Sequence, residues 1–214
     1  MSAFSALWLR LIRLAFRLFY NPLAWTYDPV SWIVSQGHWR RWQRTALEEL
    51  TGTKVLDLAF GTGNMLVDLA LAGFDMTGLD LSPTMGRIAR HKLRRAGLPI
   101  PLVRGRAQQL PFPDAHFDAV LSTFPANFIF SGWTLSEVAR VLKPGGRFVV
   151  VAMGLLKGRD GWSRFLEWLY RITAQRMPVP DLDELLAPAG LSYRTVWRSV
   201  GNTEVLIYLL EHIT

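Results

Sequence analysis

Two glycines and an aspartate in the first half of the chain have the types and the spacing of a nucleotide-binding site. Gly61 and Gly63 follow an apolar run, and Asp80 closes a second apolar run about twenty residues further on. Because glycine has no Cβ, the backbone can turn sharply there and a ligand can lie against it. A carboxylate at the end of the second run can accept hydrogen bonds from two ribose hydroxyls. The alternative is a tight turn that binds nothing, but the position of the acid favours a nucleotide.

A strand, a helix and a second strand must position these residues. We expect a buried strand at 54–58, a helix at 64–72 and a second strand that ends at Asp80. The helix would point the free N–H groups of its first turn at the same place as the glycines. A dinucleotide fingerprint needs a third glycine, and its position is occupied by Leu66. The pattern therefore disfavours NAD.

Four stretches within residues 50–153 resemble, in order, the motifs of class I S-adenosylmethionine-dependent methyltransferases. They are VLDLAFGTG at 55–63, GLDLSPTM at 78–85, QLPFPDAHFDAV at 109–120 and VLKPGGR at 141–147. The resemblance implies methyl transfer, with S-adenosyl-L-methionine as cofactor. It also implies an α/β fold with a Rossmann-like doubly wound sheet, mostly parallel with an antiparallel C-terminal strand, plus an N-terminal helical cap.

The resemblance carries roles onto individual residues. Asp80 would hold the ribose and Leu81 the adenine face. Ala59 stands where many members have the first glycine of the turn. The methionine end of the cofactor would lie against Asp57, Ala59, Phe60, Gly61 and Gly63.

The expected adenine site departs from the family pattern. Many members place an acid followed by a small residue after the third strand, and here the acid position is Arg106. The backbone of Ala107 or the side chain of Gln108 could replace the missing carboxylate. Arg106 could also stack on adenine or meet an anionic substrate. A binding module that has kept the fold and lost catalysis is the non-enzymatic alternative.

The segment after the fourth strand is expected to face the transferred methyl group. Thr123 would touch both cofactor and acceptor, with Phe124, Pro125 and Asn127 beside it. We expect Phe128 and Phe130 to be ordinary packing residues. No general base is evident, and the candidates for catalysis are His38, Thr123 and Asn127.

The domain organisation is predicted as an N-terminal aromatic helical cap at 1–45 and a methyltransferase domain at 46–214. A lid-like insertion is expected at 155–178, and an antiparallel strand pair with Gly201 and Asn202 at its turn should close the chain. Residues 3–20 combine apolar side chains with three arginines on one helical face, which disfavours a spanning helix. They fit a basic helix in a membrane interface, or a helix that only covers the core.

The composition limits the remaining possibilities. The chain has no cysteine, which excludes disulfides and thiolate metal sites and fits a cytoplasmic protein. Its four histidines lack metal-ligand spacing, so no metal is expected. The net charge of +7 suggests an anionic partner: a membrane surface, a nucleic acid or an acidic substrate. Because of residues 3–20 we expect an anionic membrane surface, at the inner face of the membrane, rather than a nucleic acid.

The resemblance is greatest to the branch with ubiquinone/menaquinone-biosynthesis and phospholipid methyltransferases. It therefore implies a small hydrophobic or lipid-like methyl acceptor for a peripheral membrane enzyme. A soluble small-molecule acceptor is the alternative, and the oligomeric state stays open.

Overall fold

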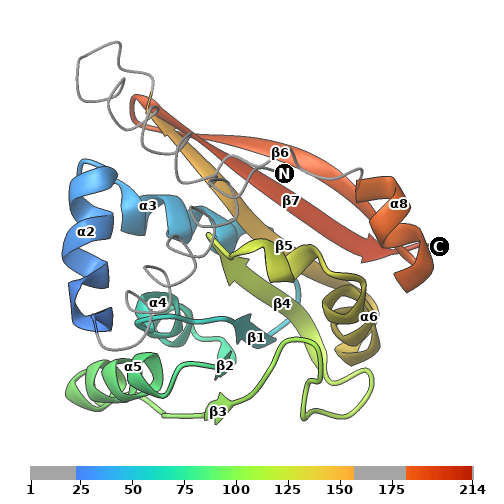
Figure 1. Cartoon of the computed structure of the whole chain (residues 1–214), viewed down its shortest axis with the longest axis horizontal. Helices are drawn as coiled ribbons and strands as arrows, with labels where there is room; N and C mark the ends of the chain where they lie inside the picture. The colour runs from blue at the N-terminus through green and yellow to red at the C-terminus, as the bar shows by residue number, and fades with distance from the viewer. Residues whose placement is uncertain (1–22, 157–181, 214) are drawn as a thin grey trace, which may run out of the picture.

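The computed structural model describes residues 23–156 and 182–213, which form one seven-stranded sheet with helices on both faces (Figure 1). The strand order is β3-β2-β1-β4-β5-β7-β6; the first five strands pair in parallel, and β7 pairs antiparallel with both β5 and β6. This is the predicted doubly wound α/β fold with antiparallel C-terminal strands. The strands are β1 (Lys54–Leu58), β2 (Asp75–Asp80), β3 (Leu102–Arg104), β4 (Phe117–Thr123), β5 (Leu142–Leu156), β6 (Leu191–Val200) and β7 (Thr203–His212).

Helices precede, connect and follow these strands. The α-helices are α2 (Tyr27–Val34), α3 (Trp39–Arg44), α4 (Asn64–Leu71), α5 (Pro83–Arg95), α6 (Gly132–Val141) and α8 (Leu182–Leu186). The 3-10 helices are η1 (Ala24–Thr26), η2 (Thr45–Glu49), η3 (Asn127–Phe130) and η4 (Ala187–Ala189). Within this part of the chain, no helix is long and apolar enough to cross a membrane.

Alternation along the buried strands gives the sheet an apolar core on each face. In β1, Leu56 joins the core that packs under α6 and α8, whereas its neighbour Val55 joins the core under α3, α4 and α5. Successive side chains of a strand point to opposite faces, so a strand covered on both sides is apolar throughout. The arrangement leaves the carboxyl ends of β1, β2 and β4 together at one edge.

Serine, proline and glycine residues that cap helices or form turns explain several local details of the fold. Ser82 caps α5, because its hydroxyl accepts a hydrogen bond of 3.2 Å from the N–H of Met85, and Pro83 opens the helix. The Lys-Pro-Gly-Gly residues at 143–146 do not end the strand but form an irregularity inside β5, where pairing with β4 shifts between Leu142 and Arg147. Gly201 and Asn202 connect β6 to β7, as predicted.

The predicted insertion at 155–178 begins inside a strand. Leu155 and Leu156 still pair with β7, opposite Glu204 and Thr203. The rest of that insertion and the basic helix predicted at 3–20 lie outside the described residues.

The N-terminal helices are fastened to the sheet layer by buried contacts. Arg40 and Arg44 of α3 both pair with the buried carboxylate of Asp68 on α4, at 2.8 and 2.7 Å. The indole of Trp42 donates a hydrogen bond of 2.8 Å to Thr203 and packs so closely on Gly154 that a Cβ there would lie 2.3 Å from a ring carbon. These contacts hold α3 over the edge where β4 ends.

Candidate active site

The glycine-rich turn after β1 has a left-handed backbone at three positions. The φ angles are +64° at Ala59, +56° at Gly61 and +79° at Gly63. A Cβ at Gly63 would lie 2.6 Å from the Cβ of Ala89, so this position requires glycine for space as well as conformation. Ala59 adopts the same conformation with a side chain, which is strained for an L-residue. Its N–H donates a hydrogen bond of 2.7 Å to the carbonyl of Leu79 and joins the turn to β2.

Asp80 at the end of β2 connects the turn to the next helix. Its Oδ2 accepts a hydrogen bond of 2.9 Å from the N–H of Gly61, and its Oδ1 accepts one of 2.7 Å from the N–H of Ser82. Burial raises the pKa of this carboxyl, and hydrogen bonds from the backbone of Ser82, Gly61 and Leu81 act in the opposite direction. The carboxylate keeps further lone pairs on the side that faces the pocket.

Asp57 lies deeper, inside β1, and its carboxyl group is unusual. The residue is 1% exposed, and its Oδ2 has no hydrogen-bond partner. Burial raises the pKa of Asp57 to about 8, and the negative charge of Asp80 adds to the effect. A buried acceptor without a partner is costly, so this oxygen suits a ligand group that brings a positive charge or donors.

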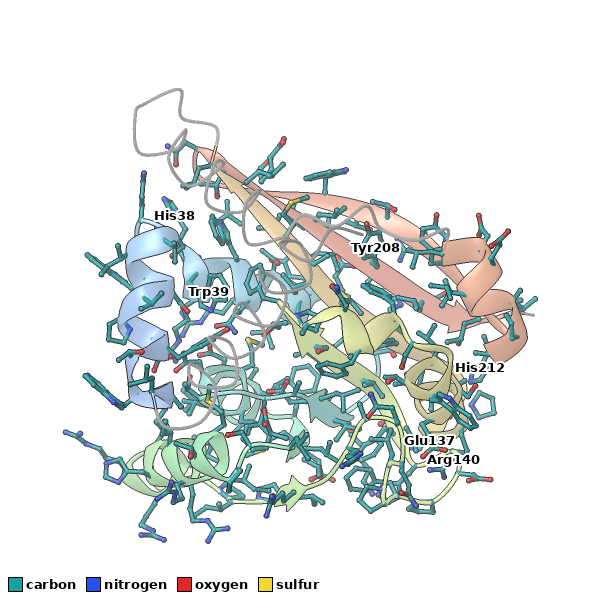
Figure 2. The ribbon with its side chains drawn as sticks, in the orientation of Figure 1. His38, Trp39, Glu137, Arg140, Tyr208 and His212 are labelled. Carbon is teal, nitrogen blue, oxygen red and sulfur yellow. The ribbon has the colours of Figure 1, made fainter. Side chains whose placement is uncertain are left out.

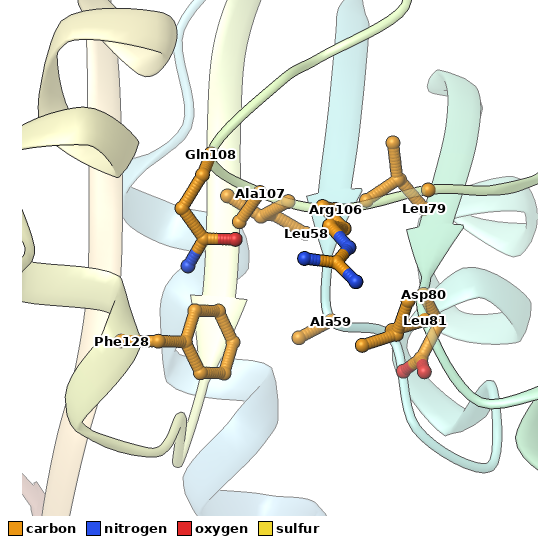
Figure 3. Close-up of a pocket in the computed structure, with 10 residues that line it drawn as sticks. Leu58, Ala59, Leu79, Asp80, Leu81, Arg106, Ala107, Gln108 and Phe128 are labelled. Carbon is orange, nitrogen blue, oxygen red and sulfur yellow. The ribbon is translucent and has the colours of Figure 1, made fainter.

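A pocket of about 210 Å³ opens beside Asp80 at the carboxyl edge of the sheet (Figure 3). It includes five of the residues predicted for the cofactor, namely Ala59, Asp80, Leu81, Arg106 and Ala107. The guanidinium of Arg106 points into the space between Ala59 and Asp80 in Figure 3. Leu58, Leu79, Gly105, Gln108 and Phe128 complete the lining.

The other predicted cofactor residues lie outside this lining. Phe60 is 8% exposed and packs in the core, where its ring would contact any Cβ at Gly78. Only its backbone therefore belongs to the turn. The prediction for Phe128 was wrong: its ring faces the pocket because η3 follows the tip of β4 there. Phe130 packs against Tyr208, at 6.0 Å between ring centroids, as expected.

Outside the pocket lining, an aromatic wall forms where α3 lies over the tip of β4. It comprises His38, Trp39, Gln43, Thr123 and Phe124. The amide Nε2 of Gln43 donates a hydrogen bond of 2.9 Å to the hydroxyl of Thr123. The rings of Trp39 and Phe124 pack with centroids 4.1 Å apart, and Phe124 has a left-handed φ of +49°. The wall therefore combines large aromatic faces with one threonine hydroxyl.

Three polar atoms on this wall are buried without a partner. They are Nδ1 of His38, Nε1 of Trp39 and Oε1 of Gln43. A buried donor and a buried acceptor that lack hydrogen-bond partners, beside an aromatic surface, suit a ligand that is both aromatic and polar. Gln43 was not predicted, since only the fold brings it to Thr123.

The structure gathers the three catalytic candidates only loosely. His38 stacks on Trp42, at 6.0 Å between ring centroids, and directly precedes Trp39 at the start of α3 (Figure 2). Thr123 ends β4 and accepts the bond from Gln43. Asn127 is exposed at the start of η3.

Comparisons with known proteins agree with this geometry. A methyltransferase domain family matches residues 55–146. The chain is 33% identical over 204 residues to a demethylmenaquinone methyltransferase of Tropheryma whipplei, covering 91% of this chain and 81% of the relative. It is 31% identical over 207 residues to the ubiquinone/menaquinone biosynthesis C-methyltransferase UbiE of Cupriavidus necator, covering 90% and 81%.

Solved structures share the fold at lower identity. A protein from Methanococcus maripaludis has a TM-score of 0.65 at 18% identity, covering 88% of this chain and 92% of its own. The [4+2]-cyclase SpnF has a TM-score of 0.57 at 19% identity, covering 82% and 81%. Since one of these proteins is a cyclase, the reaction is inferred from the sequence relatives rather than from the fold.

The chain belongs to the class I S-adenosylmethionine-dependent methyltransferases. Its methyl donor is S-adenosyl-L-methionine, and its reaction class is EC 2.1.1.-, as predicted. Within this class it is similar to the demethylmenaquinone and ubiquinone/menaquinone methyltransferases.

Proposed function

We propose that this protein methylates a ring carbon of a hydrophobic, quinol-type acceptor. The observation that carries the proposal is the aromatic contact of Trp39 with Phe124, together with three buried atoms that have no partner: Nδ1 of His38, Nε1 of Trp39 and Oε1 of Gln43. A quinol ring presents an aromatic face and two hydroxyls, and so matches that combination. The relatives named as demethylmenaquinone methyltransferases support the same acceptor class.

The residues at the edge of the sheet fit the cofactor. We assign its ammonium group to Asp57, because a cation beside the unpartnered Oδ2 would satisfy a buried acceptor. A bound cation would also lower the raised pKa of that carboxyl. We assign the ribose hydroxyls to Asp80 and the adenine to the pocket between Leu81, Arg106 and Phe128.

The cofactor, when bound, supplies an electrophilic methyl group on a positively charged sulfur. The protein's own task is then to hold the acceptor carbon in line with that methyl group. Such orientation can supply about 7–11 kcal/mol of the barrier in favourable cases. Trp39 and Phe124 would orient the ring by stacking, and Thr123, fixed by Gln43, would limit its approach.

The acceptor must also lose a proton. The ring provides the electron pair of the new carbon–carbon bond, the sulfur keeps the pair of the broken bond, and the ring proton leaves. We assign this proton to His38, because its Nδ1 is unpartnered whereas the Thr123 hydroxyl is engaged by Gln43. Replacing His38 by asparagine should lower kcat and leave the affinity for S-adenosylmethionine unchanged.

The test is a label-partition assay with a defined acceptor. The protein is incubated with methyl-labelled S-adenosylmethionine and a reduced short-chain demethylmenaquinone in detergent, and the organic phase is extracted. We expect label in the organic phase with wild type and a large loss with Asp80→Ala. If label appears only in the aqueous phase with a cell extract, the acceptor is a soluble molecule. If calorimetry detects no cofactor binding, the protein is a catalytically silent module.

A further inference from the structure

Helix α2 carries its polar and apolar faces the wrong way round for a helix that packs on a core. Its buried positions include Ser31 at 5% exposure, followed by Ser35 at 1%. The apolar side chains face outward: Trp25 in the preceding η1 is 71% exposed, Trp32 is 65% exposed and Ile33 is 50% exposed. A surface helix normally shows the opposite pattern, so this outward face suits an apolar partner.

One partly exposed carboxylate fixes this orientation through three hydrogen bonds. Asp28 of α2 accepts hydrogen bonds from the Thr62 hydroxyl at 2.7 Å, the Asn64 amide at 3.1 Å and the Lys92 ammonium at 2.6 Å. These donors come from the glycine-rich turn, the start of α4 and α5. The polar face of α2 is therefore tied to the site, and its apolar face cannot rotate inward without breaking three bonds.

Helix α5 lies beside α2 at the same end of the molecule and is strongly basic (Figure 1). It contains no acidic residue, and Lys92 is turned toward Asp28. Four arginines on α5 stay exposed, namely Arg87, Arg90, Arg94 and Arg95. The helix with the exposed apolar side chains is thus joined, through the Asp28–Lys92 ion pair, to a helix with four exposed arginines.

We propose that these two surfaces together form a docking face for an anionic lipid bilayer. The docking face comprises Trp25, Trp32 and Ile33 together with Arg87, Arg90, Arg94 and Arg95. Tryptophan favours the membrane interface, and exposed arginines are attracted to anionic headgroups. A nucleic acid would use the arginines but leave the apolar side of α2 in water, so the bilayer explains more of the surface.

The docking face adjoins the elements that build the site. Asp28 links it to the glycine-rich turn, and α3 continues from α2 to the wall at Trp39. A bilayer bound there would lie next to the carboxyl edge of the sheet. The inference does not require the methyl acceptor to be a lipid, since docking and methyl transfer can be measured separately.

The absence of cysteine from the sequence allows a direct test on the full chain. Ile33→Cys is labelled with an environment-sensitive fluorophore and mixed with phosphatidylcholine vesicles, with and without phosphatidylglycerol. We expect a blue shift and an intensity rise with the anionic vesicles only. The control is Trp133→Cys on α6, a site that is 79% exposed and outside the docking face, where no change is expected. No change at position 33, or the same change at position 133, would overturn the proposal.

The contribution of the arginines is tested by neutralising two of them in the labelled Ile33→Cys protein. The double change Arg90→Gln and Arg94→Gln should weaken partition onto anionic vesicles by about 30-fold. Arg194→Gln, at an exposed position on the distant strand β6, should leave partition unchanged. Equal partition of the double variant would contradict the proposal. A signal with RNA but none with vesicles would assign the arginines to a nucleic acid instead.

Discussion

The main-chain N–H of Gly61 donates a hydrogen bond of 2.9 Å to Oδ2 of Asp80. Gly61 lies in the turn after β1 and Asp80 ends β2, so the bond joins two neighbouring strand ends. The other carboxylate oxygen receives the N–H of Ser82, the cap of α5. Asp80 therefore shapes the edge of the sheet as well as offering lone pairs to a ligand.

Replacing Asp80 by asparagine should separate the two roles of its side chain. The amide keeps the size of the side chain but loses the charge and one acceptor oxygen. Hydrogen bonds to charged groups contribute about 1.5–3 kcal/mol, so the affinity for S-adenosylmethionine should fall about 10- to 100-fold by calorimetry. Asp75→Asn, at the exposed start of the same strand, should bind like wild type. Equal affinity of the two variants would remove Asp80 from the cofactor site.

The raised pKa of Asp57 predicts a stability that falls with pH. The carboxyl titrates near pH 3.9 in the unfolded chain and at about 8 in the folded protein. Between these values the folded protein holds a proton that the unfolded chain has lost. The free energy of unfolding should therefore fall as the pH rises from about 4 to about 8, by up to about 1.4 kcal/mol per pH unit. Asp57→Asn should lack this loss, so its Tm advantage over wild type should grow across that range.

Asp68 supplies a control of opposite sign. Burial raises its pKa, but hydrogen bonds and charge from Arg44 and Arg40 lower it by a larger amount. The pKa of Asp68 in the folded protein therefore lies below the ordinary value. Its stabilisation is present above the unfolded pKa and is lost as the pH falls. Asp68→Asn should thus lower the Tm at neutral pH and approach wild type in acid. Parallel Tm curves for wild type and Asp57→Asn would refute the role of Asp57.

The left-handed backbone of Ala59 predicts a stabilising change to glycine. Relief of strain is worth about 1–2 kcal/mol, and the greater freedom of glycine in the unfolded chain returns about 0.4–1 kcal/mol. Ala59→Gly should therefore raise the Tm by a few degrees in calorimetry. Ala115→Gly, at a φ of +47° in the turn before β4, should do the same away from the site. A lower Tm for Ala59→Gly alone would mean that the alanine methyl group packs favourably.

The motifs predict the parts of the site that are local in sequence. The turn from Ala59 to Gly63, the acid at Asp80 and the cap at Ser82 each depend on residues a few positions apart or within one strand–helix–strand unit. Conformation and hydrogen bonding there follow from glycine, proline and apolar runs. The doubly wound, mostly parallel sheet follows from the family resemblance.

The parts that the sequence does not predict are contacts between distant segments. The bonds from Gln43 to Thr123 and from Thr62 to Asp28 join residues whose approach depends on how the N-terminal helices pack. The inverted faces of α2 also become visible only once Asp28 is placed. Phe128 was misjudged for the same reason, because the position of its ring in the pocket lining depends on where η3 turns after β4.

The close packing of Gly154 on Trp42 predicts intolerance to a single methyl group. Gly154→Ala would place a Cβ against the indole of Trp42. The indole is fixed by its hydrogen bond to Thr203, and Gly154 is fixed by strand pairing with β7, so this overpacking should cost about 1–3 kcal/mol. The denaturation midpoint should fall accordingly. Gly86→Ala, in α5 with open space at its Cβ, should instead stabilise by about 0.5–1 kcal/mol. A neutral result at Gly154 would indicate that α3 can shift on the sheet.

Two tryptophans of α3 differ in their indole partners. We therefore expect replacement of one to affect mainly stability and replacement of the other to affect mainly the KM for the acceptor. Nε1 of Trp42 donates to Thr203, whereas Nε1 of Trp39 is buried without a partner. Trp42→Phe should lower the free energy of unfolding by about 1–3 kcal/mol, because the buried Thr203 hydroxyl loses its donor. Trp39→Phe loses no internal bond, so its unfolding curve should change less.

Acceptor kinetics should show the reverse order. If the indole N–H of Trp39 donates a hydrogen bond to an oxygen of the bound quinol, Trp39→Phe should raise the KM for the quinol about 5- to 10-fold. This factor corresponds to the free energy of one neutral hydrogen bond. Trp42→Phe should keep the KM near that of wild type, since its ring stays in place on Gly154. The KM for S-adenosylmethionine is the internal reference and should not change in Trp39→Phe. An unchanged quinol KM in Trp39→Phe would leave the donor without a ligand and move the acceptor away from α3.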